Sequence, residues 1–163
     1  MLLLMSVQGC IVADPPVFEQ PEKTPPFLDL AAANPPISAI LQQGPADPVL
    51  INVPFRSEDA GERLQAVLFL NYQTPTEDPQ KTNYLDPGTF SERREIKMEW
   101  IVPSVPDSTC EQLTLQVTHV DNLIGASELK DKSDVALATW WVDIQINDTP
   151  AEFATCPRIG GGT

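Results

Sequence analysis

The chain has 163 residues, enough for one domain with extensions, and 42% of them are hydrophobic, so it can bury a core. Its 23 acidic residues outnumber 10 basic ones and give a formal net charge of −13. Nucleic-acid binding needs clustered Lys and Arg on phosphates, so this balance argues against a nucleic-acid partner. Solubility of an exported protein explains the acidity more simply than an acid-dependent activity.

The chain begins with a short apolar, uncharged stretch, residues 1–9, directly before Cys10. The stretch is too short to span a bilayer and is typical of the end of a secretory signal peptide. The sequence VQGC resembles the lipobox of bacterial lipoproteins, with Gly9 before the cysteine, Val7 in the usual place of Leu, and Gln8 as a departure. The resemblance implies a lipid on Cys10. The alternative is a buried N-terminal strand with a free thiol.

A proline-rich segment follows, and Ile11 is its first residue after the cysteine. Asp in that place retains lipoproteins of enteric bacteria in the inner membrane, so Ile11 implies attachment to the outer membrane. The prolines of residues 10–47 leave no room for a long helix and favour an extended tether. The tether also carries apolar residues at Phe27–Leu30 and Ile37–Leu41. It is therefore either a spacer or a segment that packs on the domain or on a partner.

The domain itself is predicted over residues 48–158, with a disordered tail at 159–163. Apolar and polar residues alternate with a period of two, which predicts strands. The predicted strands are Val49–Phe55, Arg63–Tyr72, Arg94–Val102, Glu111–Val120 and Val135–Ile146, with a weaker one near Thr82–Leu85.

The last two predicted strands would pair as an antiparallel hairpin at the centre of the domain. Trp140 is placed in the core, because the opposite face of its strand carries Asp143 and Gln145. In such a hairpin the start of one strand lies beside the end of the next, so Cys110 and Cys156 could meet in a disulfide. The chain-entropy model gives such a bridge roughly 4 kcal/mol of stabilisation. The alternative is two unpaired thiols.

Strand number, spacing and length over residues 48–158 resemble an immunoglobulin-like or fibronectin type III-like domain. The predicted fold class is therefore all-β: a single Ig-like antiparallel β-sandwich, preceded by the proline-rich extended tether.

No catalytic constellation stands out around His119, which is the one histidine of the chain. Thr118 faces the other way and Ser127 lies on a loop, so no hydroxyl is placed for activation, and we expect a partly buried histidine bonded to backbone. The loop with Asp121, Asn122, Glu128, Asp131 and Asp134 offers oxygen ligands, but its spacing matches no calcium loop. We predict no enzyme activity, no metal and no cofactor.

Three large apolar residues, Phe69, Ile101 and Trp141, fall on the predicted solvent faces of their strands. Exposed large apolar groups often mark an interface. On one sheet they could form a patch for a protein partner, or they could hold the apolar part of the tether.

The sequence thus predicts a lipid-anchored envelope protein of a Gram-negative bacterium, on the periplasmic or cell-surface side of the outer membrane. Its expected role is non-catalytic: it binds a protein partner or is a structural subunit of an envelope or surface assembly. A subunit should show an apolar patch or an unsatisfied strand edge. The alternative is a carbohydrate- or cell-wall-binding module, which should show two or more coplanar exposed aromatic rings.

Overall fold

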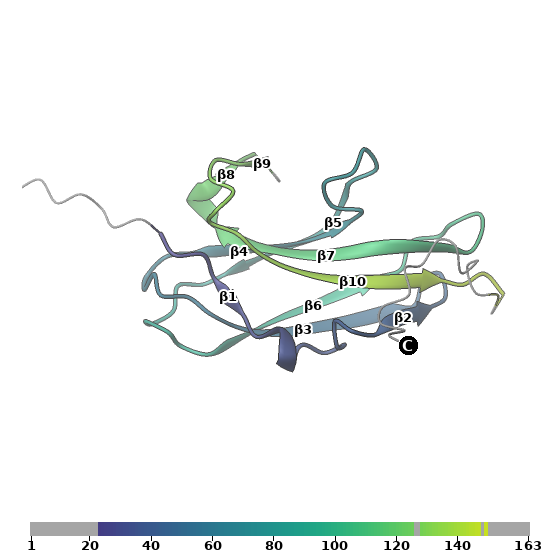
Figure 1. Ribbon diagram of the computed structural model, residues 1–163, viewed down its shortest axis with the longest axis horizontal. Helices are drawn as coiled ribbons and strands as arrows, with labels where there is room; N and C mark the ends of the chain where they lie inside the picture. Colours follow the sequence, from purple (N-terminus) through teal and green to yellow (C-terminus); the bar gives the residue numbers. More distant parts are fainter. Residues whose placement is uncertain (1–22, 126–127, 148, 150–163) are drawn as a thin grey trace, which may run out of the picture.

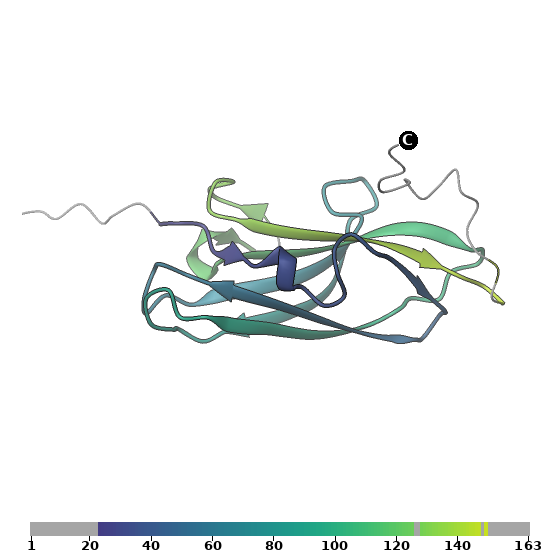
Figure 2. The same cartoon turned by 60° about the horizontal axis from the view of Figure 1, so that its bottom comes forward.

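The computed structural model describes residues 23–125, 128–147 and 149. These residues form a three-stranded and a five-stranded sheet packed face to face, with a small hairpin at one end (Figures 1 and 2). Two short 3₁₀ turns, Leu30–Ala32 and Val120–Asn122, are the helical elements of the described part. The predicted all-β fold class is confirmed.

The three-stranded sheet has the order β1-β3-β6 and is antiparallel throughout. Its strands are β1 (Phe27–Leu28), β3 (Pro48–Arg56) and β6 (Arg94–Ile101). Alternation along β3 and β6 turns one face of each strand into the core, as a half-buried sheet requires.

The five-stranded sheet has the order β2-β10-β7-β4-β5. Its strands are β2 (Ile40–Gln43), β10 (Ala136–Ile144), β7 (Thr109–His119), β4 (Leu64–Leu70) and β5 (Asp78–Leu85). The β2–β10 pair is parallel and the other three pairs are antiparallel, including the predicted hairpin of β7 and β10. The small hairpin consists of β8 (Leu123–Ile124) and β9 (Glu128–Leu129).

Two tryptophans from opposite sheets anchor the core between the layers. Trp140 of β10 is fully buried, and its indole Nε1 donates to the carbonyl of Pro35 at 2.9 Å. Trp100 of β6 is almost fully buried, and its Nε1 donates to Oε1 of Gln80 at 3.2 Å. The prediction that Trp140 faces the core is confirmed. Both indole donors are satisfied, as burial of tryptophan requires.

Of the two interpretations of the predicted tether, a spacer is wrong for its described part, and packing of its apolar residues on the domain is confirmed. Strand β1 pairs with β3, and β2 pairs with β10 in the register Trp141 to Ile40. Leu28 and Leu41 are buried in the same core cluster as the later strands. The domain therefore begins before Pro48. Short extended pieces between prolines fit the outer strands of a sheet, where one side of the backbone needs no ladder partner.

The first strand of the sandwich is divided between the two sheets: β1 joins β3, and the chain then crosses to place β2 beside the last strand, β10. Figure 2 shows this N-terminal segment passing across one side of the sandwich, from β1 to β2. Together with the central β10-β7-β4 sheet opposite β3-β6, this is the arrangement of an immunoglobulin-like sandwich.

Candidate functional site

The histidine singled out in the sequence, His119, ends β7 and is fully buried. Its Nδ1 lies 2.7 Å from Oδ1 of Asp134, and its Nε2 lies 3.4 Å from Oδ2 of Asp59, within ion-pair range but without hydrogen-bond geometry. The predicted burial is confirmed, but the predicted backbone partner is wrong. The carboxylates of Asp59 and Asp134, from loops far apart in the sequence, flank the ring instead. The alternation along β7 carries no information about these loops.

The hydroxyl nearest to this histidine in sequence is occupied elsewhere. Thr118 donates to the backbone carbonyl of Asp134 and accepts from Nδ2 of Asn122 at 2.8 Å. To activate a side-chain hydroxyl as a general base, a histidine must lie within hydrogen-bond reach of it. The arrangement of Thr118, Asn122 and Asp134 ties the loop before β10 to the end of β7.

Charged residues extend this cluster to the start of the described chain. Nζ of Lys23 lies 2.5 Å from Asp121 and 3.2 Å from Glu62, and the backbone N–H of Thr24 donates to Asp59 at 2.9 Å. Partial burial acts to lower the pKa of Lys23, but its bonds to both carboxylates hold that pKa above its ordinary value. The same bond from Lys23 lowers the pKa of Asp121.

The buried carboxyl of the cluster, Asp134, shows the opposite shift. Burial raises its pKa, against the opposing effect of its bond to His119. Burial disfavours the charged form of an acid, which is why the histidine beside it matters. Together the charges of the cluster fasten the chain entry, the β3–β4 loop and the loop before β10 to one end of the sandwich.

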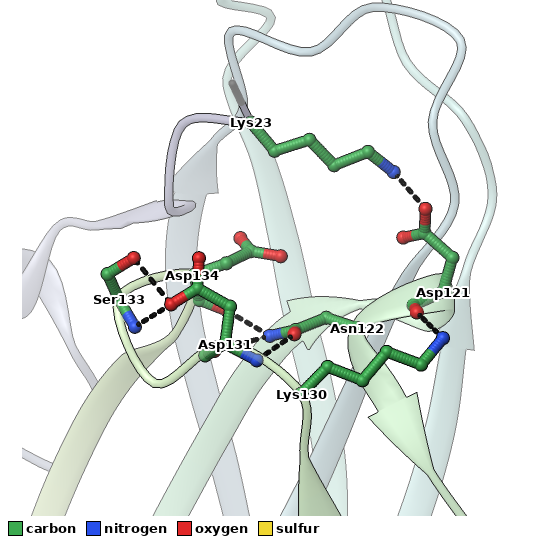
Figure 3. A pocket seen from close by; sticks show the side chains of 7 residues that line it. All are labelled: Lys23, Asp121, Asn122, Lys130, Asp131, Ser133 and Asp134. Carbon is green, nitrogen blue, oxygen red and sulfur yellow. Dashed lines mark hydrogen bonds and ion pairs between the residues drawn. The ribbon is translucent and has the colours of Figure 1, made fainter. Parts of the chain in front are cut away.

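A polar hollow of about 400 Å³ opens above this cluster, and Figure 3 shows the seven residues that line it. Asp131 accepts from both the N–H and the hydroxyl of Ser133, which lowers its pKa, and Nζ of Lys130 donates to the carbonyl of Asp121. Among the described residues, no three His, Cys, Asp or Glu side chains come together as a metal site. Glu128, a ligand candidate in the sequence, lines a different hollow.

The three predicted interface residues do not share a surface. Phe69 is fully buried, so its prediction as an exposed residue is wrong; its ring contacts that of Tyr72, with 5.1 Å between centroids. Trp141 is half-buried on the outer face of the five-stranded sheet, whereas Ile101 is 52% exposed on the other sheet. The alternation along β4 placed Phe69 on the solvent face of its strand. That face is covered because the chain after β4 folds back and brings Tyr72 against it.

The outer face of the three-stranded sheet carries an apolar patch that the sequence pattern located only through Ile101. Leu50 of β3 is 59% exposed and lies diagonally across from Ile101, because Pro48 is the direct register partner of Ile101. We call Pro48, Leu50 and Ile101 the β3–β6 patch. The sequence could have identified Leu50 as an exposed apolar residue. It lies two residues before Asn52 on the outward face of β3, where alternation predicts a polar residue.

The cysteine predictions can be placed only in part. Cys110 lies in β7 opposite Asp143 of β10, whereas Cys10, Cys156, the signal stretch 1–9 and the tail 159–163 lie outside the described residues. Lipidation of Cys10 and a bridge between Cys110 and Cys156 stay predictions. In the described part of the chain, no helix is long and apolar enough to cross a membrane.

Comparisons with known proteins add little to this geometry. A scan of protein families finds no match for the chain, and a search among curated proteins finds none either. A solved chain from the complex between zinc 2-glycoprotein and prolactin inducible protein of human seminal plasma is 10% identical, over 78% of this chain and 100% of that chain, with a TM-score of 0.39. Neither the identity nor the TM-score supports a functional comparison.

Proposed function

We propose that this protein is a non-catalytic, lipid-anchored envelope protein whose sandwich binds a protein partner through the β3–β6 patch. The observation that carries the proposal is the exposure of Leu50 and Ile101, at 59% and 52%, on the outer face of the three-stranded sheet. An apolar patch on a sheet face is a feature of an interaction surface rather than of a catalytic cleft.

The surroundings of the patch suit a protein interface. Lys97 and Glu95 form a 2.8 Å ion pair on the same outward face of β6, and both are well exposed. Apolar residues with a rim of charged ones are the common composition of protein–protein interfaces. Phe27 of β1 is also exposed, at 65%, but it pairs with Arg56 at the other end of β3 and lies outside the patch.

The lipid anchor rests on the sequence VQGC and on the position of the described chain entry. Lys23, the first described residue, is bound to Glu62 and Asp121 at the end of the sandwich where β7 finishes. A chain anchored at Cys10 would therefore approach the sandwich at this end. The outer face of β3 and β6 runs along the side of the sandwich, where a lateral partner can reach it.

A photo-crosslinking experiment tests the partner. A photoreactive phenylalanine analogue in place of Leu50, in the protein produced in its own cells, should yield a crosslinked species on irradiation. The same analogue in place of Leu137, an exposed leucine of the five-stranded sheet, is the matched control. We expect a specific product from position 50 and none from position 137.

Two negative charges introduced into the apolar patch then test its contribution to partner binding. Leu50→Glu with Ile101→Glu should abolish co-purification of the crosslinked partner, while Leu137→Glu should leave it intact. An equal loss from both variants, or no crosslink at position 50, would contradict the assignment of this face.

A further inference from the structure

The outer face of the five-stranded sheet carries a hollow of about 520 Å³, which we call the outer hollow. Val135 and Leu137, at the start of β10, form its floor. Two segments rise on this side of the sheet and flank the hollow: the chain between β4 and β5, and the β8–β9 hairpin (Figure 1). Its volume is within the range of small-molecule sites.

The walls of the outer hollow combine aromatic, apolar and charged side chains. Tyr72, Gln73 and Glu77 come from the chain after β4, and Glu128, Leu129 and Lys132 come from β9 and the loop after it. Apolar surface with a few polar groups at fixed positions is the usual composition of a ligand site. These walls suit a small ligand that is itself partly apolar and partly polar, as a sugar is.

A buried side-chain amide without a partner lies directly beside the floor. Gln116 of β7 is the register partner of Leu137 and projects from the same outer face. It is 1% exposed, yet neither its Nε2 nor its Oε1 has a hydrogen-bond partner among the described residues. The flanking outward residues of β7, Thr114 and Thr118, both have side-chain hydrogen bonds. Since buried polar groups are rarely left unpaired, the amide of Gln116 indicates a polar ligand.

The chemistry of Gln116 defines the group that would match it. A side-chain amide offers N–H donors and a carbonyl acceptor side by side, so its best complement is a second amide. An acylamino group, with its carbonyl and its N–H, is such a complement. Leu137 is 40% exposed, and an exposed side chain changes rotamer readily, so it can turn aside and admit this group to Gln116.

We propose that the outer hollow binds a small sugar that carries an acylamino group, and that this group hydrogen-bonds to Gln116. The acyl carbonyl accepts from Nε2 of Gln116, and the N–H of the ligand donates to Oε1. Tyr72 offers a ring face to the apolar side of the sugar, and the carboxylates of Glu77 and Glu128 accept from its hydroxyls.

This inference goes beyond the proposed partner binding, because the outer hollow and the β3–β6 patch lie on different sheets. A small ligand gives no protein crosslink, so Leu137 remains a valid control position for the patch. The variant Leu50→Glu with Ile101→Glu should bind the sugar as tightly as the unchanged protein does. Failure of the patch therefore leaves the test of the hollow intact.

Titration of the ¹⁵N-labelled full chain with N-acetylglucosamine tests the site. We expect a saturable shift of the side-chain amide signals of Gln116 in ¹H–¹⁵N spectra. Glucose has a hydroxyl in place of the acetamido group and should bind about tenfold more weakly or less, because it cannot pair both atoms of the Gln116 amide. No saturable shift at Gln116, as expected if the amide meets only an ordered water, would overturn the proposal. Equal binding of glucose would overturn it too.

N-acetylalanine amide tests whether the carrier of the acylamino group is a sugar. It presents the same group without hydroxyls for Glu77 and Glu128, so we expect it to bind more weakly than N-acetylglucosamine. Equal or tighter binding would overturn the assignment to a sugar.

Gln116→Met separates ligand binding from folding. It should weaken the binding of N-acetylglucosamine about tenfold or more and leave Tm unchanged or higher, because the amide has no internal hydrogen bond to lose. Thr114→Val, on the same face of β7, is the matched control: it removes a bonded hydroxyl, so it should lower Tm and keep the affinity. A lower Tm in Gln116→Met would show that the amide is bonded within the fold. That result, or an unchanged affinity, would overturn the proposal.

Discussion

His119 illustrates how a single residue is read differently in sequence and in structure. Its inward position in an alternating strand predicted burial, and the ring is fully buried. Its partners, Asp134 at 2.7 Å and Asp59 at 3.4 Å, come from loops that no local pattern connects to β7. The ring therefore lies between two loops at the end of β7, near the entry of the described chain.

The two adjacent tryptophans of β10 provide a test at the same scale. Trp140→Ser should destabilise the protein by about 3–5 kcal/mol, because it empties a fully buried site and removes the donor to Pro35. Trp141→Ser should cost much less, since Trp141 is only half-buried on the outer face. Urea unfolding of both variants gives the comparison. Equal losses would mean that the outer face at Trp141 is covered as completely as the core.

The sequence analysis placed β1 and β2, the shortest strands of the two large sheets, outside the domain. β1 and β2 have two and four residues, and prolines surround them, so neither shows a usable alternation. They are strands because β3 and β10 offer free edges at the right positions. Burial of Leu28 and Leu41 then fixes the segment on the core.

Truncation tests the contribution of this N-terminal segment. A chain that begins at Pro48 should lose several kcal/mol of stability, because it exposes the sites of Leu28 and Leu41 and leaves the edge of β10 unpaired. A chain that begins at Lys23 keeps every described contact of the segment and is the control. Thermal unfolding followed by tryptophan fluorescence compares them. A Pro48 chain as stable as the control would return the segment to the role of a spacer.

At the scale of the whole molecule, charge and apolar surface are separated. The ion-pair cluster around Lys23 and Asp121 lies at one end of the sandwich, and the β3–β6 patch lies along one side. A protein attached to a membrane at its N-terminus would therefore present the patch laterally. This division of surfaces is what the proposed function requires.

The anchor is tested by intact mass of the protein from native membranes. We expect a chain that begins at Cys10 and carries the mass of a lipid, because VQGC resembles a lipobox. Cys10→Ser is the control and should release the protein from the membrane fraction. An unmodified chain that begins at Met1 would remove the anchor, while the interaction at Leu50 could still be tested.

Much of the fold was determined by the sequence itself. The alternation in β3, β4, β6, β7 and β10 specified the strands, because a half-buried strand must repeat every second residue, and the same pattern placed Trp140 in the core. Strand number and spacing then indicated the immunoglobulin-like sandwich, which the strand order bears out.

Tertiary structure alone decided the rest. Phe69 is buried because Tyr72 returns over it, and β1 and β2 exist because sheet edges were available. Asp59 and Asp134 meet His119 because loops from distant parts of the chain converge at one end of the sandwich. Each of these features depends on contacts between residues far apart in the chain. A periodic pattern reports the face of a strand, but it does not report what covers that face.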